Sequence, residues 1–294
     1  MVEAFYELHT GSVQYVVSDP RTRGCAIIDP VLDYDEKAGA TATFSADALL
    51  AYVQEEKLRV EWILDTHPHA DHLSAMAYLK DRTGAPTAIG AKIVEVQKLW
   101  KDVYNLPETF PTDGSQWDRL FCDADSFRIG ELPAAVLFSP GHTLASVTYL
   151  VGDAAFVHDT LFMPDGGTAR ADFPGGDARA LWHSIQRILS LPGQTRLFTG
   201  HDYRPGGREP AWESTAADQR AANVHLLAAP NEAAFVAFRE ARDRELPMPR
   251  LILHAMQVNI AAGRLPAPEA NGRNYLKIPI DALDHPTWGN DSDA

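Results

Sequence analysis

The stretch Thr66-His67-Pro68-His69-Ala70-Asp71-His72 places three histidines and one aspartate within seven residues. It directly follows the apolar run 60–65, which predicts a short buried strand. Imidazole nitrogens and carboxylate oxygens are ligands for zinc, iron and manganese, so this stretch alone supplies four donors. The alternative is a solvated polar loop that happens to be rich in histidine. Four donors directly after an apolar strand favour a metal site.

The geometry of this stretch divides its donors into two pairs. In an extended loop His67 and His69 lie on the same side of the chain, because side chains alternate with a period of two. Residues 70–82 predict a helix, so we expect Asp71 and His72 to lie at its start and to face a second metal position.

Three more donors follow predicted strands further along the chain. His142 lies in Pro140-Gly141-His142-Thr143, Asp159 ends the strand predicted for 154–158, and His201 lies in Gly200-His201-Asp202. Individually, an aspartate at a strand end is a common turn former, and a single histidine is often only hydrogen-bonded. Together they predict one site at the ends of several strands, where loops on a rigid scaffold collect functional groups.

The rest of the sequence predicts two sets of strands, each followed by helices. Strands are predicted over residues 2–19, 25–31, 60–65, 86–90, 127–129, 134–139, 147–151, 154–158 and 195–199. Helices are predicted over residues 45–56, 70–82, 91–103, 177–191, 211–227 and 231–245, with Ser45 and Asp177 as N-caps. We expect 104–123 to be mostly loop, and a Pro- and Gly-rich tail to follow residue 245. This order is typical of a sandwich of two sheets with helices on both outer faces.

Composition limits the classes of function. The chain has 294 residues, of which 45% are hydrophobic and 22% charged, and its formal net charge is −14. Such a surface repels a phosphate backbone, so we expect no nucleic-acid partner. Two cysteines are too few for a disulfide framework. Without an apolar run of about 18 residues or a signal-like N-terminus, we expect no membrane association and a cytoplasmic location.

The donors quoted above match, in order, the HxHxDH motif, later histidine, aspartate and last histidine of the metallo-β-lactamase superfamily, which the chain resembles. The resemblance implies an α/β fold, the αβ/βα sandwich, with residues 1–210 as catalytic core and 211–294 as a C-terminal helical segment and tail packed on it. It implies one metal position formed by His67, His69 and His142, a second formed by Asp71, His72 and His201, and Asp159 as a bridge. Class B lactamases usually lack the last histidine of the motif, so His72 argues against antibiotic hydrolysis.

Three further runs narrow the resemblance to bacterial persulfide dioxygenases, with glyoxalase II as the next nearest relative. These runs are DTLFMPDGGTARADFPGGDA (159–178), GHDYRPGGREPAWES (200–214) and QVNIAAGRLP with NGRNYLKIP (257–279). The resemblance implies oxidation of glutathione persulfide by O2 to glutathione and sulfite, at one Fe(II) per chain held by His67, His142 and Asp159. Two imidazoles and a carboxylate leave three coordination positions open for substrate and O2. The expected partners are thus a small thiol or persulfide and O2, and a homodimer is an option.

Two other functions stay open at this point. A glyoxalase II-like thioester hydrolase uses one or two metal ions, usually zinc, and shares all seven donors and a glutathione-type substrate. A non-catalytic scaffold is the third option, although a scaffold has no need of seven costly polar groups around a cavity.

The resemblance also implies residues on the substrate side. Arg170 matches an arginine that would clamp a carboxylate of the substrate, and its alternative is an ion pair with Asp172. Tyr203 is a second candidate, with weaker support for Arg204 and Lys277. The chain departs from the family pattern at two positions, with Ala171 where relatives often have cysteine and His158 where most of the superfamily has glycine. Asp202 is a candidate acceptor that could orient a neighbouring imidazole.

Overall fold

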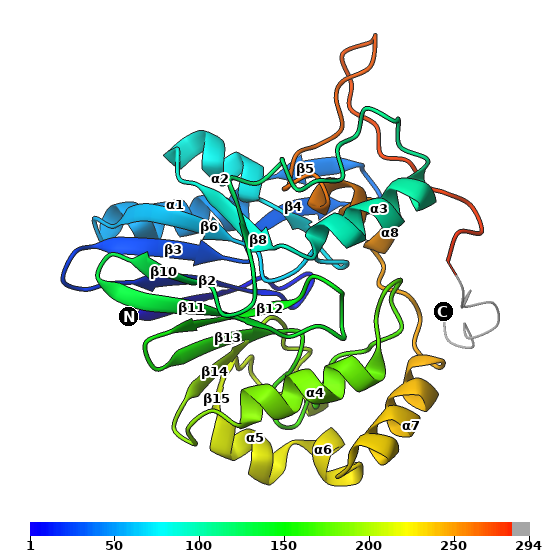
Figure 1. Cartoon of the computed structure of the whole chain (residues 1–294). Coiled ribbons are helices and arrows are strands. Elements are labelled where there is room, and N and C mark those ends of the chain that lie inside the picture. Colours follow the sequence, from blue (N-terminus) through cyan, green and yellow to red (C-terminus); the bar gives the residue numbers. More distant parts are fainter. Residues whose placement is uncertain (284–294) are drawn as a thin grey trace.

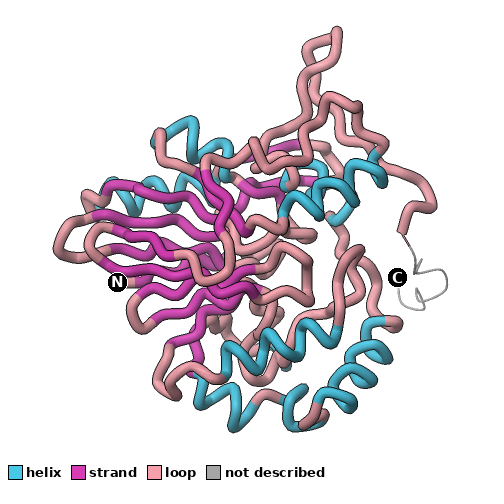
Figure 2. Tube along the Cα trace, in the orientation of Figure 1, coloured by secondary structure: helices cyan, strands magenta, loops and turns pink. Residues whose placement is uncertain are grey.

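The computed structural model describes residues 1–283 and contains two six-stranded sheets packed face to face, with helices on both outer faces (Figures 1 and 2). The first sheet has the order β1 (Val2–Tyr6), β2 (Val13–Ser18), β3 (Gly24–Ile28), β6 (Arg59–Leu64), β8 (Thr87–Gly90) and β9 (Arg119–Phe121). The second has the order β10 (Ser126–Ile129), β11 (Leu132–Phe138), β12 (Val147–Val151), β13 (Ala154–His158), β14 (Arg196–Thr199) and β15 (Glu213–Thr215). The α/β sandwich predicted from the sequence is confirmed.

The helices fall into two groups. One group packs on the outer face of the first sheet and comprises α1 (Phe44–Glu55), α2 (Met76–Thr83), α3 (Ile93–Tyr104) and α8 (Ile252–Asn259). The other packs on the second sheet and comprises α4 (Ala178–Leu189), α5 (Ala216–Ala222), α6 (Val224–Ala228) and α7 (Glu232–Asp243). In the part of the chain that is described, no helix is both long and apolar enough to cross a bilayer.

Side chains that alternate between the two faces of the central strands form three apolar cores, one between the sheets and one under each layer of helices. In β2, Tyr15 and Val17 face the core between the two sheets, whereas Val16 faces the helices of the first layer. In the second sheet Phe156 and Phe198 face inward, and Val157 faces α4. Successive strand residues point to opposite faces, so each strand contributes to two apolar layers.

The region after the histidine-rich stretch differs from the prediction. Residues 70–75 are not helical, and α2 begins only at Met76. Instead Leu73–Ser74 form the short strand β7, which pairs with β4 (Val31–Asp35) beside β5 (Ala40–Ala42). The Ser74 hydroxyl donates to both oxygens of Asp65, at 3.2 and 2.9 Å. These tertiary hydrogen bonds override the local preference for helix, so Asp71 and His72 lie in a loop.

Other element predictions also need correction. The helix predicted over 211–227 is the strand β15 followed by the separate helices α5 and α6, and the predicted loop 104–123 contains β9. Ser45 lies inside α1 and bonds to Asp33 rather than capping the helix. The predicted tail contains α8, whose apolar residues enter the core of the first layer. Asp177 does cap α4, as expected, by accepting from Ala180 N at 2.7 Å.

The chain crosses from one layer to the other near its C-terminal end. Helix α7 packs on α4 in the layer that covers the second sheet, and α8 packs on the first sheet, so residues 244–251 pass over the edge of the sandwich (Figure 1). The strand ends that carry the histidines meet at this same edge, and residues 246–251 form part of the wall of the cavity there.

Candidate metal centre

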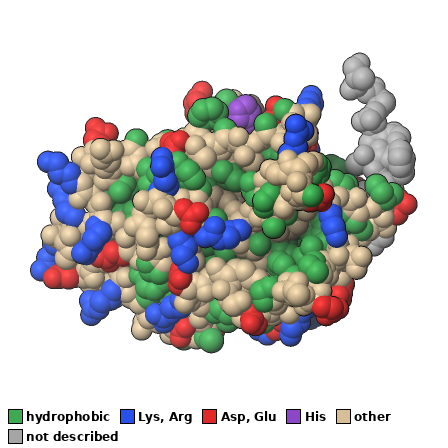
Figure 3. Space-filling model, turned by 90° about the horizontal axis from the view of Figure 1, so that it is seen from above, with side chains coloured by type: hydrophobic (Ala, Val, Ile, Leu, Met, Phe, Trp, Pro, Cys, Tyr) green, Lys and Arg blue, Asp and Glu red, His purple; other side chains and the backbone are tan. Residues whose placement is uncertain are grey.

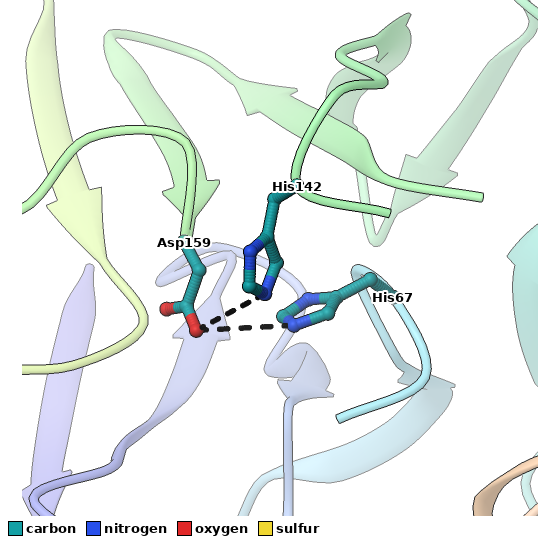
Figure 4. A group of neighbouring side chains, drawn as sticks. All are labelled: His67, His142 and Asp159. Carbon is teal, nitrogen blue, oxygen red and sulfur yellow. Dashed lines mark ion pairs between the residues drawn. The ribbon is translucent and has the colours of Figure 1, made fainter. Parts of the chain in front are cut away.

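Three of the predicted donors converge in a compact group (Figure 4). His67 follows β6, His142 follows β11, and Asp159 follows β13. The Oδ2 atom of Asp159 lies 3.9 Å from Nε2 of His67 and 3.7 Å from Nε2 of His142. All three residues are buried, at 0%, 5% and 5% exposure. Two imidazoles and one carboxylate at this spacing are a donor set for a non-haem iron or zinc ion.

Each imidazole of this group is oriented by a hydrogen bond on its other nitrogen. Nδ1 of His142 donates to the carbonyl oxygen of Arg170 at 2.9 Å. Nδ1 of His67 lies 3.0 Å from the Thr66 hydroxyl, which itself donates to Asp29 and so accepts from the ring. Each Nε2 therefore carries the lone pair, and Nε2 of His67 is buried without a hydrogen-bond partner among the described residues. An orphaned acceptor of this kind fits a metal ligand.

A second group of donors lies beside the first. His69, Asp71 and His72 each offer one ligand atom, and these three atoms lie within 4.8 Å of one another. Nδ1 of His69 and Nε2 of His72 are buried and have no partner in the described chain. The loop 66–72 thus brings its donors to two adjacent positions, but it divides them differently from the prediction. His69 groups with Asp71 and His72 rather than with His67, and the helix expected to carry Asp71 and His72 is absent.

His201 connects the two groups. Its Nδ1 contacts Oδ1 of Asp159 at 2.6 Å, and its Nε2 contacts the Asp71 carboxylate and the Ser12 hydroxyl. Asp159 therefore faces the first group with one oxygen and His201 with the other. All seven predicted donors lie together in the structure, and their ligation of a metal stays a prediction.

The electrostatics of the centre favour neutral rings for three of its histidines and ionised carboxylates for Asp71 and Asp159. Burial lowers the pKa of His67, His142 and His72, which keeps these rings neutral and able to bind a metal. Burial alone would raise the pKa of Asp159, but the attraction of His201 outweighs it and lowers that pKa. Burial opposes protonation of His201, yet Asp159 and Asp71 raise its pKa well above its usual range. Asp159 and Asp71, which face the two nitrogens of His201, therefore favour its protonated ring when no metal is bound.

Asp29 supports the loop 66–72, called the metal loop below, and it was not identified as a site residue from the sequence. It follows β3 in a left-handed conformation, with φ of 52°, and it is buried. It accepts from the Thr66 backbone N at 2.7 Å and contacts Nε2 of His69 at 3.1 Å, so it sets the position of the loop and the orientation of that ring. Burial would lower the pKa of His69, but Asp29 raises it to about 9. The available signal was a carboxylate directly after the buried run Cys25 to Ile28.

Replacing Asp29 by asparagine should weaken metal binding roughly 10- to 100-fold, the usual cost of losing a residue that orients a ligand. The substitution should also lower the pKa of His69 in the metal-free protein, because the charge that raises it is gone. Competition with a chelator measures the first effect, and NMR titration of the ring measures the second. Asp33→Asn is the matched control, because Asp33 holds Ser45 rather than the metal loop. Equal metal affinity for Asp29→Asn and wild type would contradict this role.

Asn259, the last residue of α8, holds the same loop from the opposite end of the chain. Its Nδ2 donates to the carbonyl oxygens of His69 and His72 at 2.7 and 2.8 Å, and its Oδ1 accepts from Ser74 N at 2.8 Å. The residue is 1% exposed. Three hydrogen bonds from one amide satisfy backbone groups that a buried loop would otherwise leave unpaired.

The loop 166–173, which carries Arg170, is held by a buried ion pair on α7. Arg239 pairs with Asp243 at 2.6 Å and donates to the carbonyl oxygen of Thr168 at 3.1 Å. Oδ2 of Asp243 accepts from Ala171 N at 2.8 Å. The carbonyl oxygen that orients His142 belongs to this loop, so α7 acts on the metal centre through the backbone of residues 168–171.

Arg170 lies differently from its expected role as a free carboxylate clamp. Its guanidinium forms a two-point ion pair with Asp172 at 2.6 and 2.8 Å, and donates to the carbonyl oxygens of Pro247 and Leu246 at 2.5 and 3.3 Å. Its side chain is 11% exposed. The structure thus has the ion pair with Asp172 that was the alternative interpretation. Through its hydrogen bonds to the carbonyl oxygens, Arg170 connects the segment 246–247 to its own loop, 166–173.

A cavity of about 670 Å³ opens onto the metal centre and contains Tyr203 in its wall. Tyr203 is 62% exposed, and its ring stacks on His201 with centroids 5.7 Å apart. Arg204 and Lys277 donate instead to backbone carbonyl oxygens of Arg208 and Asn105, and neither lines this cavity.

Two further expectations near the centre are resolved by the contacts. Asp202 pairs with Arg208 at 2.6 Å and contacts no imidazole among the described residues, so it does not orient a ring. His158 is buried, and its Nε2 contacts the hydroxyls of Ser139 and Thr160. Burial lowers the pKa of His158 to about 3, and its ring packs beside His67 with centroids 5.0 Å apart. His158 is therefore a neutral packing residue of the core next to the centre.

Comparison with known proteins assigns the architecture. Residues 10–201 match the family model described as the metallo-beta-lactamase superfamily. The chain is similar in structure to ETHE1 from Myxococcus xanthus, with a TM-score of 0.72 and 29% identity, covering 90% of this chain and all of that one.

Curated relatives are named as a hydrolase-like protein, a glyoxylase and a persulfide dioxygenase. A beta-lactamase hydrolase-like protein of Xylella fastidiosa is 67% identical over 98% of this chain, which spans 66% of that protein's length. A glyoxylase B2 of Dictyostelium discoideum is 48% identical over 96% of this chain and 97% of its own length. The human mitochondrial persulfide dioxygenase ETHE1 is 28% identical over 90% of this chain and 89% of its own length.

Proposed function

Because the chain belongs to the metallo-β-lactamase superfamily, we propose that it is a persulfide dioxygenase with one Fe(II) bound by His67, His142 and Asp159. The reaction consumes glutathione persulfide, O2 and water and yields glutathione, sulfite and two protons. The terminal sulfur is oxidised, O2 is reduced, and the sulfur–sulfur bond is broken. Bound iron would supply adjacent coordination positions for the persulfide sulfur and for O2.

The observation that carries this proposal is that the seven donors differ in their contacts with one another. His67, His142 and Asp159 form an open triad. His201, in contrast, contacts Asp71 with one nitrogen and the second oxygen of Asp159 with the other. In this reading Asp71, His72 and His201 are hydrogen-bonding neighbours of a mononuclear centre. The similarity in structure to ETHE1 from Myxococcus xanthus and in sequence to the human persulfide dioxygenase supports the same proposal.

The surrounding residues give this centre its chemical setting. The carbonyl oxygen of Arg170 keeps the proton of His142 on Nδ1, so that Nε2 stays free. Nδ1 of His201 contacts Oδ1 of Asp159 at 2.6 Å, which leaves Oδ2 toward the triad. Tyr203 and the apolar side chains Phe162, Phe173 and Met248 line the cavity and form an apolar part of its wall.

A thioester hydrolase with two metals is the second candidate, and a specific observation favours it. His69, Asp71 and His72 form a second donor group with two orphaned nitrogens, which is enough to hold a second ion. The names of the Xylella and Dictyostelium relatives point in the same direction. In that case a metal-activated water would attack the thioester carbonyl.

Two substrates separate these functions. Protein purified without oxygen and loaded with Fe(II) should consume O2 and release sulfite when glutathione persulfide is added, and should leave S-lactoylglutathione intact. The metal content of the same active sample should be close to one iron per chain. Rapid hydrolysis of S-lactoylglutathione by protein with two metal ions per chain, without O2 consumption on the persulfide, would replace the dioxygenase by the hydrolase.

A further inference from the structure

Arginines dominate the charge of the cavity wall outside the metal centre. Four of them, Arg170, Arg239, Arg242 and Arg250, line the cavity, and its lining carboxylates are only Asp71 and Asp159 of the centre itself. The whole chain has a formal net charge of −14, and acidic and basic side chains are interspersed over the face shown in Figure 3. In contrast to the chain as a whole, the charged side chains that line the cavity outside the metal centre are basic, and one that is not neutralised by a neighbouring carboxylate favours an anionic occupant.

Two of these arginines are already committed to the fold. Arg170 binds Asp172 and two carbonyl oxygens, and Arg239 is 1% exposed and pairs with Asp243. Their donors hold the loop 166–173 and the segment 246–247, so they are not free to receive a ligand.

Arg242 and Arg250 are in a different state. Arg242 lies in the last turn of α7, is exposed, and forms no ion pair or side-chain hydrogen bond with any residue of the described range 1–283. Arg250 forms one contact, to Glu36 at 3.4 Å, and its side chain is 63% exposed. The guanidinium of Arg242 thus has all five of its donors available on the wall of the cavity.

We infer that Arg242, assisted by Arg250, recognises a carboxylate of the substrate at a distance from its reacting sulfur. This inference rests on the proposed function for the identity of the reacting group, but the carboxylate contact itself does not depend on the chemistry. A planar guanidinium binds a carboxylate through two parallel hydrogen bonds. The hydrogen bonds from Arg170 to the carbonyl oxygens of Leu246 and Pro247 attach the segment that leads to Arg250. Arg242 then acts as the residue that selects carboxylate-bearing persulfides over neutral ones.

Kinetics with paired substrates test this assignment. For Arg242→Gln, KM for glutathione persulfide should rise about 10- to 100-fold, with a smaller change in kcat, because a charge-assisted hydrogen bond is lost. With the persulfide of glutathione diethyl ester, the ratio of KM between variant and wild type should fall toward one. Arg244→Gln on the same α7 end is the matched control, since Arg244 does not line this cavity. An equal effect of Arg242→Gln on both substrates, or none on either, would overturn the inference.

A binding measurement separates this inference from the proposed function. Calorimetric titration without O2 uses S-methylglutathione, which cannot react, and its diethyl ester. Wild type should bind the free acid about 10- to 100-fold more tightly than Arg242→Gln does, and the two proteins should bind the ester alike. If this difference is present while glutathione persulfide is not oxidised, the carboxylate contact stands and the dioxygenase assignment fails. If wild type binds acid and ester equally, Arg242 is not a carboxylate contact.

Discussion

Replacing Asp159 by asparagine should reduce the activity to below about one hundredth of wild type while leaving the fold intact. Asparagine keeps the shape of the side chain but removes the negative charge that faces both His67 and His142. It also removes the ionic partner of His201 at 2.6 Å, so one substitution disturbs both donor groups. The pKa of His201 should then fall, because one of the two carboxylates that raise it has lost its charge.

The measurement is activity with metal content on the same sample, together with the thermal midpoint of unfolding. Asp165→Asn provides a matched control, since Asp165 pairs with Arg208 at the surface rather than with an imidazole of the centre. Residual activity above a tenth of wild type in fully metal-loaded Asp159→Asn would exclude Asp159 as the anionic ligand.

The second large effect is expected from alanine substitutions that compare the two donor groups. His142→Ala should eliminate iron binding, because the proposed mononuclear centre would lose one of its three protein ligands. His72→Ala should retain measurable iron and lose about 10- to 100-fold in affinity or activity, as expected for a residue that supports ligands without binding the metal. Metal content per chain, determined after anaerobic purification, distinguishes the two variants.

Equal loss of metal in both variants would favour a dinuclear centre. So would two ions about 3.5–4 Å apart in a structure of protein with measured activity. His69 is informative here, because its Nδ1 is orphaned while Asp29 holds its Nε2. In a dinuclear hydrolase His69 would bind the second ion together with Asp71 and His72, whereas the mononuclear centre leaves it off the iron.

Much of the layered fold could be predicted because short stretches of sequence determine its strands and helices. Alternation in β2 and the apolar run of β6 predict strands directly, and Asp177 predicts the start of α4 through a side-chain cap. These features depend on residues within a few positions of each other. The seven donors were found for the same reason, since each follows a strand that the local pattern predicts.

The errors lie where distant contacts decide the structure. Residues 70–75 read as helix, yet Ser74 binds Asp65 and Asn259, which only the folded chain brings near. The tail after residue 245 contains several prolines, and its buried helix α8 was missed although Ile252 and Met256 are apolar. The interpretation of Arg170 depended on the carbonyl oxygens of Leu246 and Pro247, which are 76 and 77 residues away.

The attachment of Asn259 to the metal loop has a consequence for the order of events during synthesis. The loop carbonyls of His69 and His72 leave the ribosome 190 and 187 residues before the amide that binds them. At about 5–20 residues per second, the nascent chain therefore carries the loop for roughly ten seconds or longer before α8 can dock. During this interval the histidines are attached to a backbone without its final hydrogen bonds. The donor loop therefore reaches its final hydrogen bonding only after α8 has been synthesised and has docked.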